Sequence, residues 1–96
     1  MRWNVQSLTI DSTSWTPVTA QSYCEEIVVP AIAANGAATV DIKGRTVQGD
    51  STTEFTINAG NELPFLGGQG RFAKGDVVVY LQSTTGTVTI PIRERT

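Results

Sequence analysis

Short runs of β-branched and aromatic residues recur about every ten residues along this chain of 96, separated by polar or glycine-containing turns. About eight such runs can be counted, and their threonine and valine content suits a pleated surface. No stretch keeps the 3.6-residue periodicity of an amphipathic helix, and residues 31–34, the one helix-compatible stretch, are too few to form a helix alone. Because crossover helices are missing, a parallel βαβ fold is excluded. The pattern predicts an all-β fold, a single-domain antiparallel β-sandwich or barrel over residues 1–96.

The strongest β signal lies in residues 75–92. The first run, residues 75–83, is apolar on both parities, which predicts a central strand covered on both faces. The second run, residues 87–92, alternates between threonine or proline and aliphatic residues, which predicts a strand with one wet face. A short turn with a glycine separates the two runs and favours a β-hairpin between them. Pro91 has no backbone N–H, so we expect its N side to face a sheet edge or a bulge.

The apolar positions of the first segment change parity. Trp3 and Val5 share one parity, whereas Leu8 and Ile10 share the other. Successive residues of a strand point to opposite faces. The change therefore predicts a β-bulge near residues 6–7, or a break between two short strands.

Composition excludes several classes of function. The formal charge of −2 and the dispersed basic residues argue against nucleic-acid binding, which needs clustered positive charge. The chain has no histidine and one cysteine, Cys24, so it lacks the commonest general base and cannot form an intrachain disulfide. Cys24 is expected to be a small buried hydrophobe. No apolar run is long enough for a transmembrane helix, and residues 1–4 lack a signal region, so we expect cytoplasmic synthesis and no membrane partner.

Carboxylates are the remaining candidates for catalysis or metal binding. Glu54 and Glu62 flank the turn at residues 58–61 and would approach each other if the flanking runs formed a hairpin, but a glycosidase needs such a pair inside a cleft. A calcium site built from residues 50–54 or from Asp76 would need six to eight oxygens, and no acidic cluster supplies them. Asp76 is instead expected to close a turn by accepting a backbone hydrogen bond. We therefore predict no catalytic residue, no metal and no cofactor.

Four residues are candidates for an interface: Trp3, Trp15, Arg93 and Arg95. Trp3 lies near the terminus and Trp15 stands beside a proline in a polar stretch. Exposed aromatic rings at such positions anchor protein interfaces or stack on sugars. Arg93 and Arg95 are the nearest approach to a basic cluster, which Glu94 interrupts. The alternative for this tail is a solvated C-terminus.

The order of several short motifs resembles small virion proteins of tailed bacteriophages. The likeness begins with STSWTPVT at residues 12–19 and CEEIVV at residues 24–29. It continues with TVDIK at residues 39–43, AGNELPF at residues 59–65 and FAKGDV at residues 72–77, followed by an apolar strand and a glycine turn. Such proteins are typically jelly-roll-like sandwiches that serve as capsid decoration (cement) proteins or as small domains of fibres and tails.

The resemblance implies a non-enzymatic structural protein of the virion that binds the major capsid protein, or another virion protein, and stabilises the capsid surface. It also implies a homo-oligomer, with a trimer favoured, because multivalent docking on a symmetric shell multiplies weak contacts. It transfers no functional residues. The alternative is a carbohydrate- or cell-surface-binding module of a fibre or tail, in which Trp3 or Trp15 would stack on a sugar.

Overall fold

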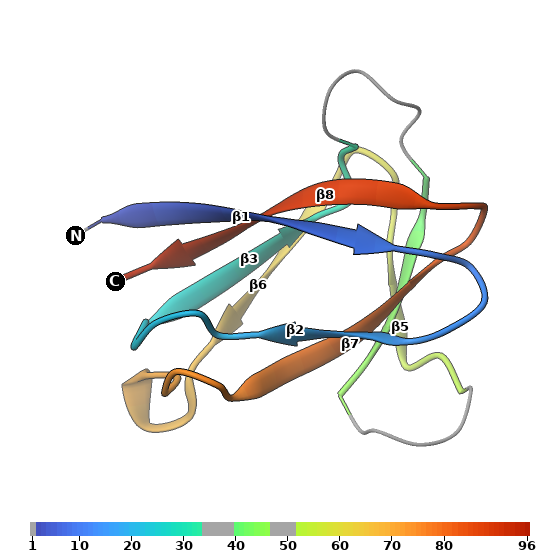
Figure 1. Ribbon diagram of the computed structural model, residues 1–96. Coiled ribbons are helices and arrows are strands. Elements are labelled where there is room, and N and C mark those ends of the chain that lie inside the picture. Colours follow the sequence, from blue (N-terminus) through green and yellow to red (C-terminus); the bar gives the residue numbers. More distant parts are fainter. Residues whose placement is uncertain (1, 34–39, 47–51) are drawn as a thin grey trace.

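The computed structural model describes residues 2–33, 40–46 and 52–96. Two four-stranded antiparallel sheets pack face to face, which confirms the predicted all-β sandwich (Figure 1). The first, here called the β1 sheet, has the order β1 (Trp3–Ile10), β8 (Val88–Arg95), β3 (Glu26–Pro30) and β6 (Glu62–Leu66). The second, the β2 sheet, has the order β2 (Thr16–Thr19), β7 (Val77–Ser83), β4 (Ile42–Arg45) and β5 (Phe55–Ile57). The 3₁₀ turn η2 (Gly68–Gly70) lies between β6 and β7.

The strand pairing is that of a jelly roll. Antiparallel pairs join β1 to β8, β2 to β7, β3 to β6 and β4 to β5, so the first half of the chain pairs with the second half as one long hairpin would. Pairs β3–β8 and β4–β7 then complete the two sheets. Rolling such a hairpin gives the eight-stranded double sheet of the jelly roll. The jelly-roll-like architecture expected from the resemblance is therefore present.

The hairpin predicted for residues 75–92 is not formed. Both strands exist, but β7 pairs with β2 and β4 while β8 pairs with β1 and β3 (Figure 1). The Ser83 hydroxyl donates to the carbonyl of Gly86, and Gly86 takes the positive φ of 64° that the turn requires. A tight turn determines that the chain reverses direction, but it does not determine whether the two strands pair in one sheet. Here the two strands face each other across the core and do not share a sheet. β7 is central as predicted, but it is not covered on both faces, since only the face with Val79, Leu81 and Ser83 is buried.

Pro91 also lies where the sequence did not place it. It belongs to β8, which runs between β1 and β3 in the interior of the β1 sheet. Arg2 and Thr96 exchange backbone hydrogen bonds, and along an antiparallel pair only every second residue bonds to the partner strand. Pro91 lies five residues before Thr96, so its backbone nitrogen points away from β1 and toward β3. The pairing of β8 with β3 covers Arg95 to Arg93 and stops there, so Pro91, two residues earlier in the chain, has no partner residue in β3. The missing donor therefore lies beyond the end of a ladder, not at an edge or a bulge.

Strand β1 contains no bulge and no break. Its register with β8 is continuous from the pair Trp3–Arg95 to the pair Ile10–Val88. Ile10 is buried and Leu8 packs against the core, whereas Trp3 and Val5 lie on the opposite face, 44% and 64% exposed. The parity change in the sequence thus marks apolar side chains on both faces of one regular strand.

The core lies between the two sheets. Buried side chains alternate with more exposed ones along β8 and β7, and the buried ones point into this core. Every second residue of β8 is buried, and Val79, Leu81 and Ser83 are the buried residues of β7. The Phe55 ring lies over Gly44 on the neighbouring strand and 5.9 Å from the ring of Phe65 in the other sheet. The largest fully buried side chains are Ile10, Ile27, Ile42, Leu81, Ile90, Ile92, Val18, Val29, Val79, Cys24 and Ser83.

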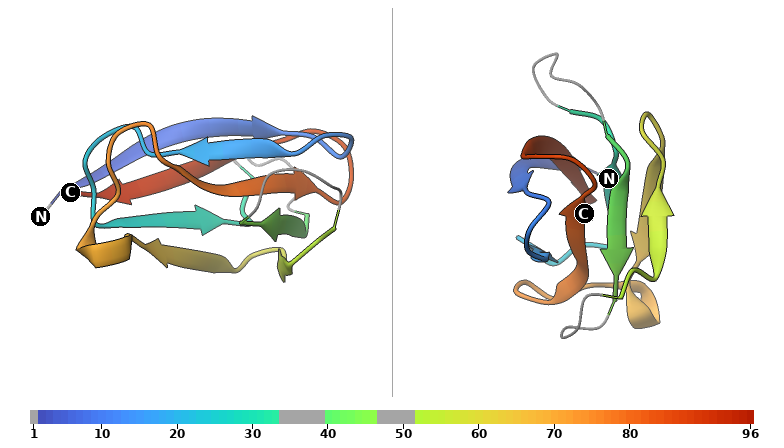
Figure 2. Two further views of the ribbon diagram at one scale, coloured as in Figure 1. Left: turned by 90° about the horizontal axis from the view of Figure 1, so that it is seen from below. Right: turned by 90° about the vertical axis from the view of Figure 1, so that its right-hand side faces the viewer.

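The chain ends lie side by side at one end of the sandwich (Figure 2). The Thr96 N–H donates to the Arg2 carbonyl at 2.8 Å, and the Arg2 N–H donates back at 3.3 Å. Residues 93–95 are therefore not a solvated tail: they are the last residues of β8, paired on both sides. None of the described residues forms a helix long and apolar enough to span a bilayer.

Candidate interaction surface

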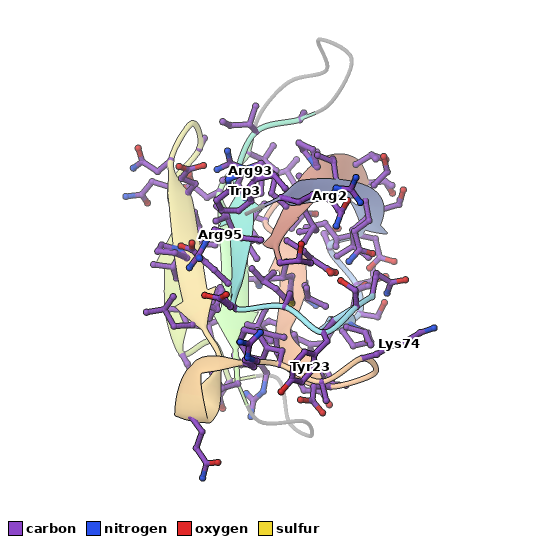
Figure 3. The ribbon with its side chains drawn as sticks, turned by 90° about the vertical axis from the view of Figure 1, so that its left-hand side faces the viewer. Arg2, Trp3, Tyr23, Lys74, Arg93 and Arg95 are labelled. Carbon is purple, nitrogen blue, oxygen red and sulfur yellow. The ribbon has the colours of Figure 1, made fainter. Side chains whose placement is uncertain are left out.

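The outer face of the β1 sheet gathers three of the four interface candidates. Register aligns the side chains of Trp3, Arg95, Glu26 and Leu66 in one row across β1, β8, β3 and β6. The row beside it is formed by Val5, Arg93, Val28 and Pro64. Figure 3 shows Trp3, Arg93 and Arg95 close together on this side of the molecule. We call these two rows the arginine face.

Arg93 is held between an aromatic ring and a carboxylate. Its guanidinium carbon lies 5.5 Å from the ring centroid of Trp3, a cation–π distance. The same guanidinium forms an ion pair with Glu62 at the start of β6. The side chains of Trp3 and Glu62 are partly exposed, so this chain of contacts spans the surface of the sheet from one edge to the other. These contacts hold the Arg93 guanidinium beside the Trp3 ring.

Arg95 is held by two carboxylates of the neighbouring segment. Its Nε lies 2.9 Å from Glu26 Oε1, and its Nη1 lies 3.2 Å from Glu25 Oε2. The hydrogen bond to Glu26 raises the pKa of Arg95 above its ordinary value, and the charges of both glutamates act in the same direction. The guanidinium is therefore cationic and fixed in place.

Apolar side chains flank these charges at both edges of the sheet. Val5 on β1 is 64% exposed and Leu66 on β6 is 70% exposed, while Trp3 is 44% exposed. Single exposed apolar residues are ordinary on protein surfaces. Here three of them share one face with two ordered arginines, a composition typical of protein–protein interfaces. The arrangement is suited to binding.

Trp15, the fourth candidate, is separate from this face. It directly precedes β2 in the other sheet and is half-buried. The guanidinium carbon of Arg45, on β4, lies 5.8 Å from its ring centroid. The Trp15 indole N–H is buried and has no hydrogen-bond partner among the described residues. The four candidates thus divide between the two sheets, three on one and one on the other.

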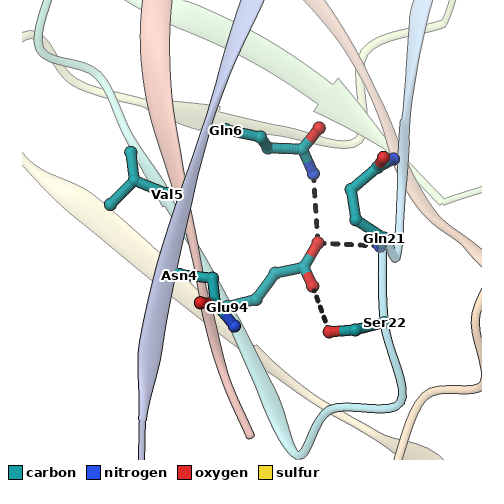
Figure 4. A pocket seen from close by; sticks show the side chains of 6 residues that line it. All are labelled: Asn4, Val5, Gln6, Gln21, Ser22 and Glu94. Carbon is teal, nitrogen blue, oxygen red and sulfur yellow. Dashed lines mark hydrogen bonds between the residues drawn. The ribbon is translucent and has the colours of Figure 1, made fainter.

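A buried carboxylate, which the sequence reasoning missed, lies at the open end of the sandwich (Figure 4). Glu94 continues the inward parity of β8 and is only 2% exposed. Its Oε2 accepts from Gln6 Nε2 at 3.1 Å and from the Gln21 N–H at 2.8 Å, and its Oε1 accepts from the Ser22 hydroxyl at 3.0 Å. These bonds tie β8 to β1 and to the connection between β2 and β3. Beside the carboxylate lies a hollow of about 190 Å³, lined by Asn4, Val5, Gln6, Gln21, Ser22 and Glu94.

Cys24 is fully buried next to this carboxylate. Burial raises the pKa of its thiol, and the charge of Glu94 raises it further. A protonated, buried thiol is a poor nucleophile. Among the described residues, no three side chains of the metal-binding types come together.

The acidic residues considered for catalysis do not form a pair. Glu54 accepts hydrogen bonds from the N–H and hydroxyl of Thr46, whereas Glu62 binds Arg93 on the other sheet. β5, which follows Glu54, and β6, which begins at Glu62, belong to different sheets, so the turn at residues 58–61 does not make a hairpin. Asp76 closes its turn as predicted, accepting from the Ala73 N–H at 2.9 Å. Residues 50 and 51 of the candidate calcium loop lie outside the described residues.

Comparison of the chain with protein-family models, with curated proteins and with solved structures finds no match.

Proposed function

We propose that this protein is a non-enzymatic structural protein of a phage virion, a capsid decoration (cement) protein that binds the capsid surface through its arginine face and stabilises it. The observation that carries the proposal is that exposed Trp3 and Val5 at one edge, and Leu66 at the other, flank the ordered Arg93 and Arg95 on one sheet face. The jelly roll supports it, because this fold recurs in viral capsid proteins. The partner would be the major capsid protein or another virion protein.

The residue types of the arginine face, and their order before binding, are suited to docking on a repeating capsid lattice. Tryptophan and arginine are the residue types most enriched at the energetic centres of interfaces. Both are ordered before binding, since Arg93 contacts Trp3 and Glu62, and this reduces the entropy lost on association. A domain of this size gains modest affinity from one such face. Many copies docked on one shell, or several joined in an oligomer, add avidity without new contacts.

Exposed aromatic rings favour a second candidate, a carbohydrate- or cell-surface-binding module. Tyr23 is 61% exposed and Trp3 is 44% exposed. However, each ring has an arginine close by, with Arg71 5.2 Å from the Tyr23 centroid and Arg93 5.5 Å from that of Trp3. The two aromatic residues also lie apart in Figure 3, so they do not make one stacking platform. Protein docking fits this geometry better than sugar stacking.

The test is saturable binding of the purified protein to expanded capsids of the phage that encodes it, prepared without this chain. We expect Trp3→Ala and Arg93→Ala each to weaken binding about tenfold or more, the loss of a central interface contact. The matched control is Thr56→Ala on the outer face of the β2 sheet, which should bind like the natural protein. Absence of capsid binding, together with glycan binding that Trp3→Ala abolishes, would instead support the carbohydrate module.

A further inference from the structure

Four strands form the edges of the two sheets, and three of them carry features that discourage pairing with another chain. β6 contains Pro64, β5 is three residues long, and β2 is four residues long with Pro17 and a register shift after Val18. Short edges, prolines and bulges are the usual protections against edge-to-edge association. β1 has none of them: it is eight residues long, without proline, lysine or register shift.

The open side of β1 presents a regular row of backbone groups. The reciprocal bonds of Arg2 with Thr96 show that even-numbered residues of β1 bond to β8. The N–H and C=O groups of Trp3, Val5, Ser7 and Thr9 therefore point away from the sheet. Among the described residues, β1 pairs with no strand other than β8. Such a row is a template for one more strand.

We propose that a second copy of this chain occupies this edge, with β1 of one copy antiparallel to β1 of the other about a two-fold axis. The two β1 sheets of four strands would then form one continuous sheet of eight. An edge that pairs with its own copy is self-complementary and closes at two subunits. The contact therefore predicts a dimer, not the trimer that the phage resemblance implies. This inference goes beyond the proposed function and does not depend on it.

Charge complementarity selects a second copy in the antiparallel direction. Arg2 precedes β1 and Asp11 follows it, and no charged residue lies between them. In antiparallel pairing centred on Gln6, Arg2 of each copy would lie opposite Ile10 of the other, one residue from Asp11, so ends of opposite charge would meet. Parallel pairing would bring ends of like charge together. The N–H groups of Thr13 and Ser14 bond the Asp11 carboxylate and lower its pKa, so it is ionised at neutral pH.

The side chains next to the edge suit this contact. Val5 and Trp3 are the exposed apolar residues of β1, and both lie on its outer face. In a pairing centred on Gln6, the Val5 side chain would lie opposite Ser7 of the second copy, and Trp3 opposite Thr9. β-branched and aromatic cross-strand pairs stabilise antiparallel sheets. Pairing would therefore bury part of the apolar surface that the isolated chain exposes.

The test is the mass in solution, measured by light scattering behind a sizing column across a range of concentrations. We expect a dimer for the natural protein, and a rise of about tenfold or more in the dissociation constant for Val5→Lys, because edge lysines oppose strand pairing. Leu66→Lys is the matched control, since it removes an exposed aliphatic side chain from the same sheet at the other edge. It should stay dimeric. Circular dichroism would verify that both variants are folded.

Amide hydrogen exchange separates an edge ladder from other kinds of dimer. If β1 pairs with β1, the amides of Val5, Ser7 and Thr9 exchange more slowly as the protein concentration rises, and Ser7→Pro, which removes one outward donor, weakens the dimer. A monomer at all concentrations, a trimer, or a dimer lost in Leu66→Lys but kept in Val5→Lys would overturn the proposal. Because purified protein alone is used, the result is independent of the capsid assay.

Discussion

Replacement of Glu94 by alanine should be among the most destabilising single changes outside the aliphatic core. The carboxylate is 98% buried and accepts three hydrogen bonds, from Gln6, the Gln21 backbone and Ser22. These bonds connect three segments that are distant in sequence and meet at the open end of the sandwich. Alanine removes the acceptor from all three donors at once.

The magnitude follows from those three contacts. A hydrogen bond to a charged group contributes about 1.5–3 kcal/mol, and part of this is recovered when water reaches the donors left behind. The hollow beside Glu94 admits water, so we take about 1 kcal/mol per bond and about 3 kcal/mol in total for Glu94→Ala. Glu94→Gln is the matched control. It keeps one oxygen for Gln6 and Gln21, and the Ser22 hydroxyl can turn to accept from the new amide, so its cost is about 1 kcal/mol.

Urea unfolding followed by circular dichroism measures both free energies. For a domain of this size, 3 kcal/mol corresponds to a fall of roughly 12–24 °C in melting temperature. Equal stability of Glu94→Ala and the natural protein would refute the structural role of this carboxylate. Equal losses in the alanine and glutamine variants would show that the negative charge, and not the hydrogen-bond geometry, is what stabilises this end of the sandwich.

Three further predictions follow from single sites. Gly44→Ala should lower the free energy of unfolding by about 1–3 kcal/mol, because a Cβ there would lie 2.3 Å from the Phe55 ring. Gly68→Ala is the control: its Cβ would meet open space, so urea unfolding should give the free energy of the natural protein. Cys24 should react with a thiol reagent at neutral pH more slowly in the native than in the unfolded protein, since it is fully buried and burial raises its pKa; equal rates in the two states would contradict this. The pKa of Asp11 is below its ordinary value of 3.8 in the folded state, so its stabilisation is present above that value and lost as pH falls through the folded pKa. Stability measured from pH 6 to pH 2 should therefore fall less steeply in Asp11→Asn, and parallel curves would contradict the assignment.

Much of the fold could be predicted from periodicity. The alternation of apolar residues in β8 and the recurring turns predicted short antiparallel strands in a sandwich, because a strand with one apolar face must cover it against another sheet. The same alternation extends through Ile92 to position 94, so the inward direction of Glu94 was also present in the sequence. It was missed because residues 93–95 were considered as a charged tail.

The interface candidates could be predicted only in part. The sequence indicated Trp3, Arg93 and Arg95 by residue type, but it could not show that they are neighbours, because they lie about ninety residues apart and meet through the β1–β8 register. It likewise gave no reason to separate Trp15 from them. The parity change in the first segment was a signal of exposed apolar residues on β1, but a bulge explains the same pattern.

By itself the sequence determined that the chain forms about eight short strands joined by turns, which face of most strands is apolar, and that the chain has no histidine for catalysis. The tertiary structure decided which strands share a sheet. Residues 75–92 illustrate the reason: a turn with a glycine reverses the chain equally well within one sheet or across the core. The choice depends on long-range partners, and β8 finds eight paired residues in β1, at the other end of the chain. Local sequence cannot report a pairing whose free energy comes from residues so distant, and the arginine face and the open β1 edge both result from that pairing.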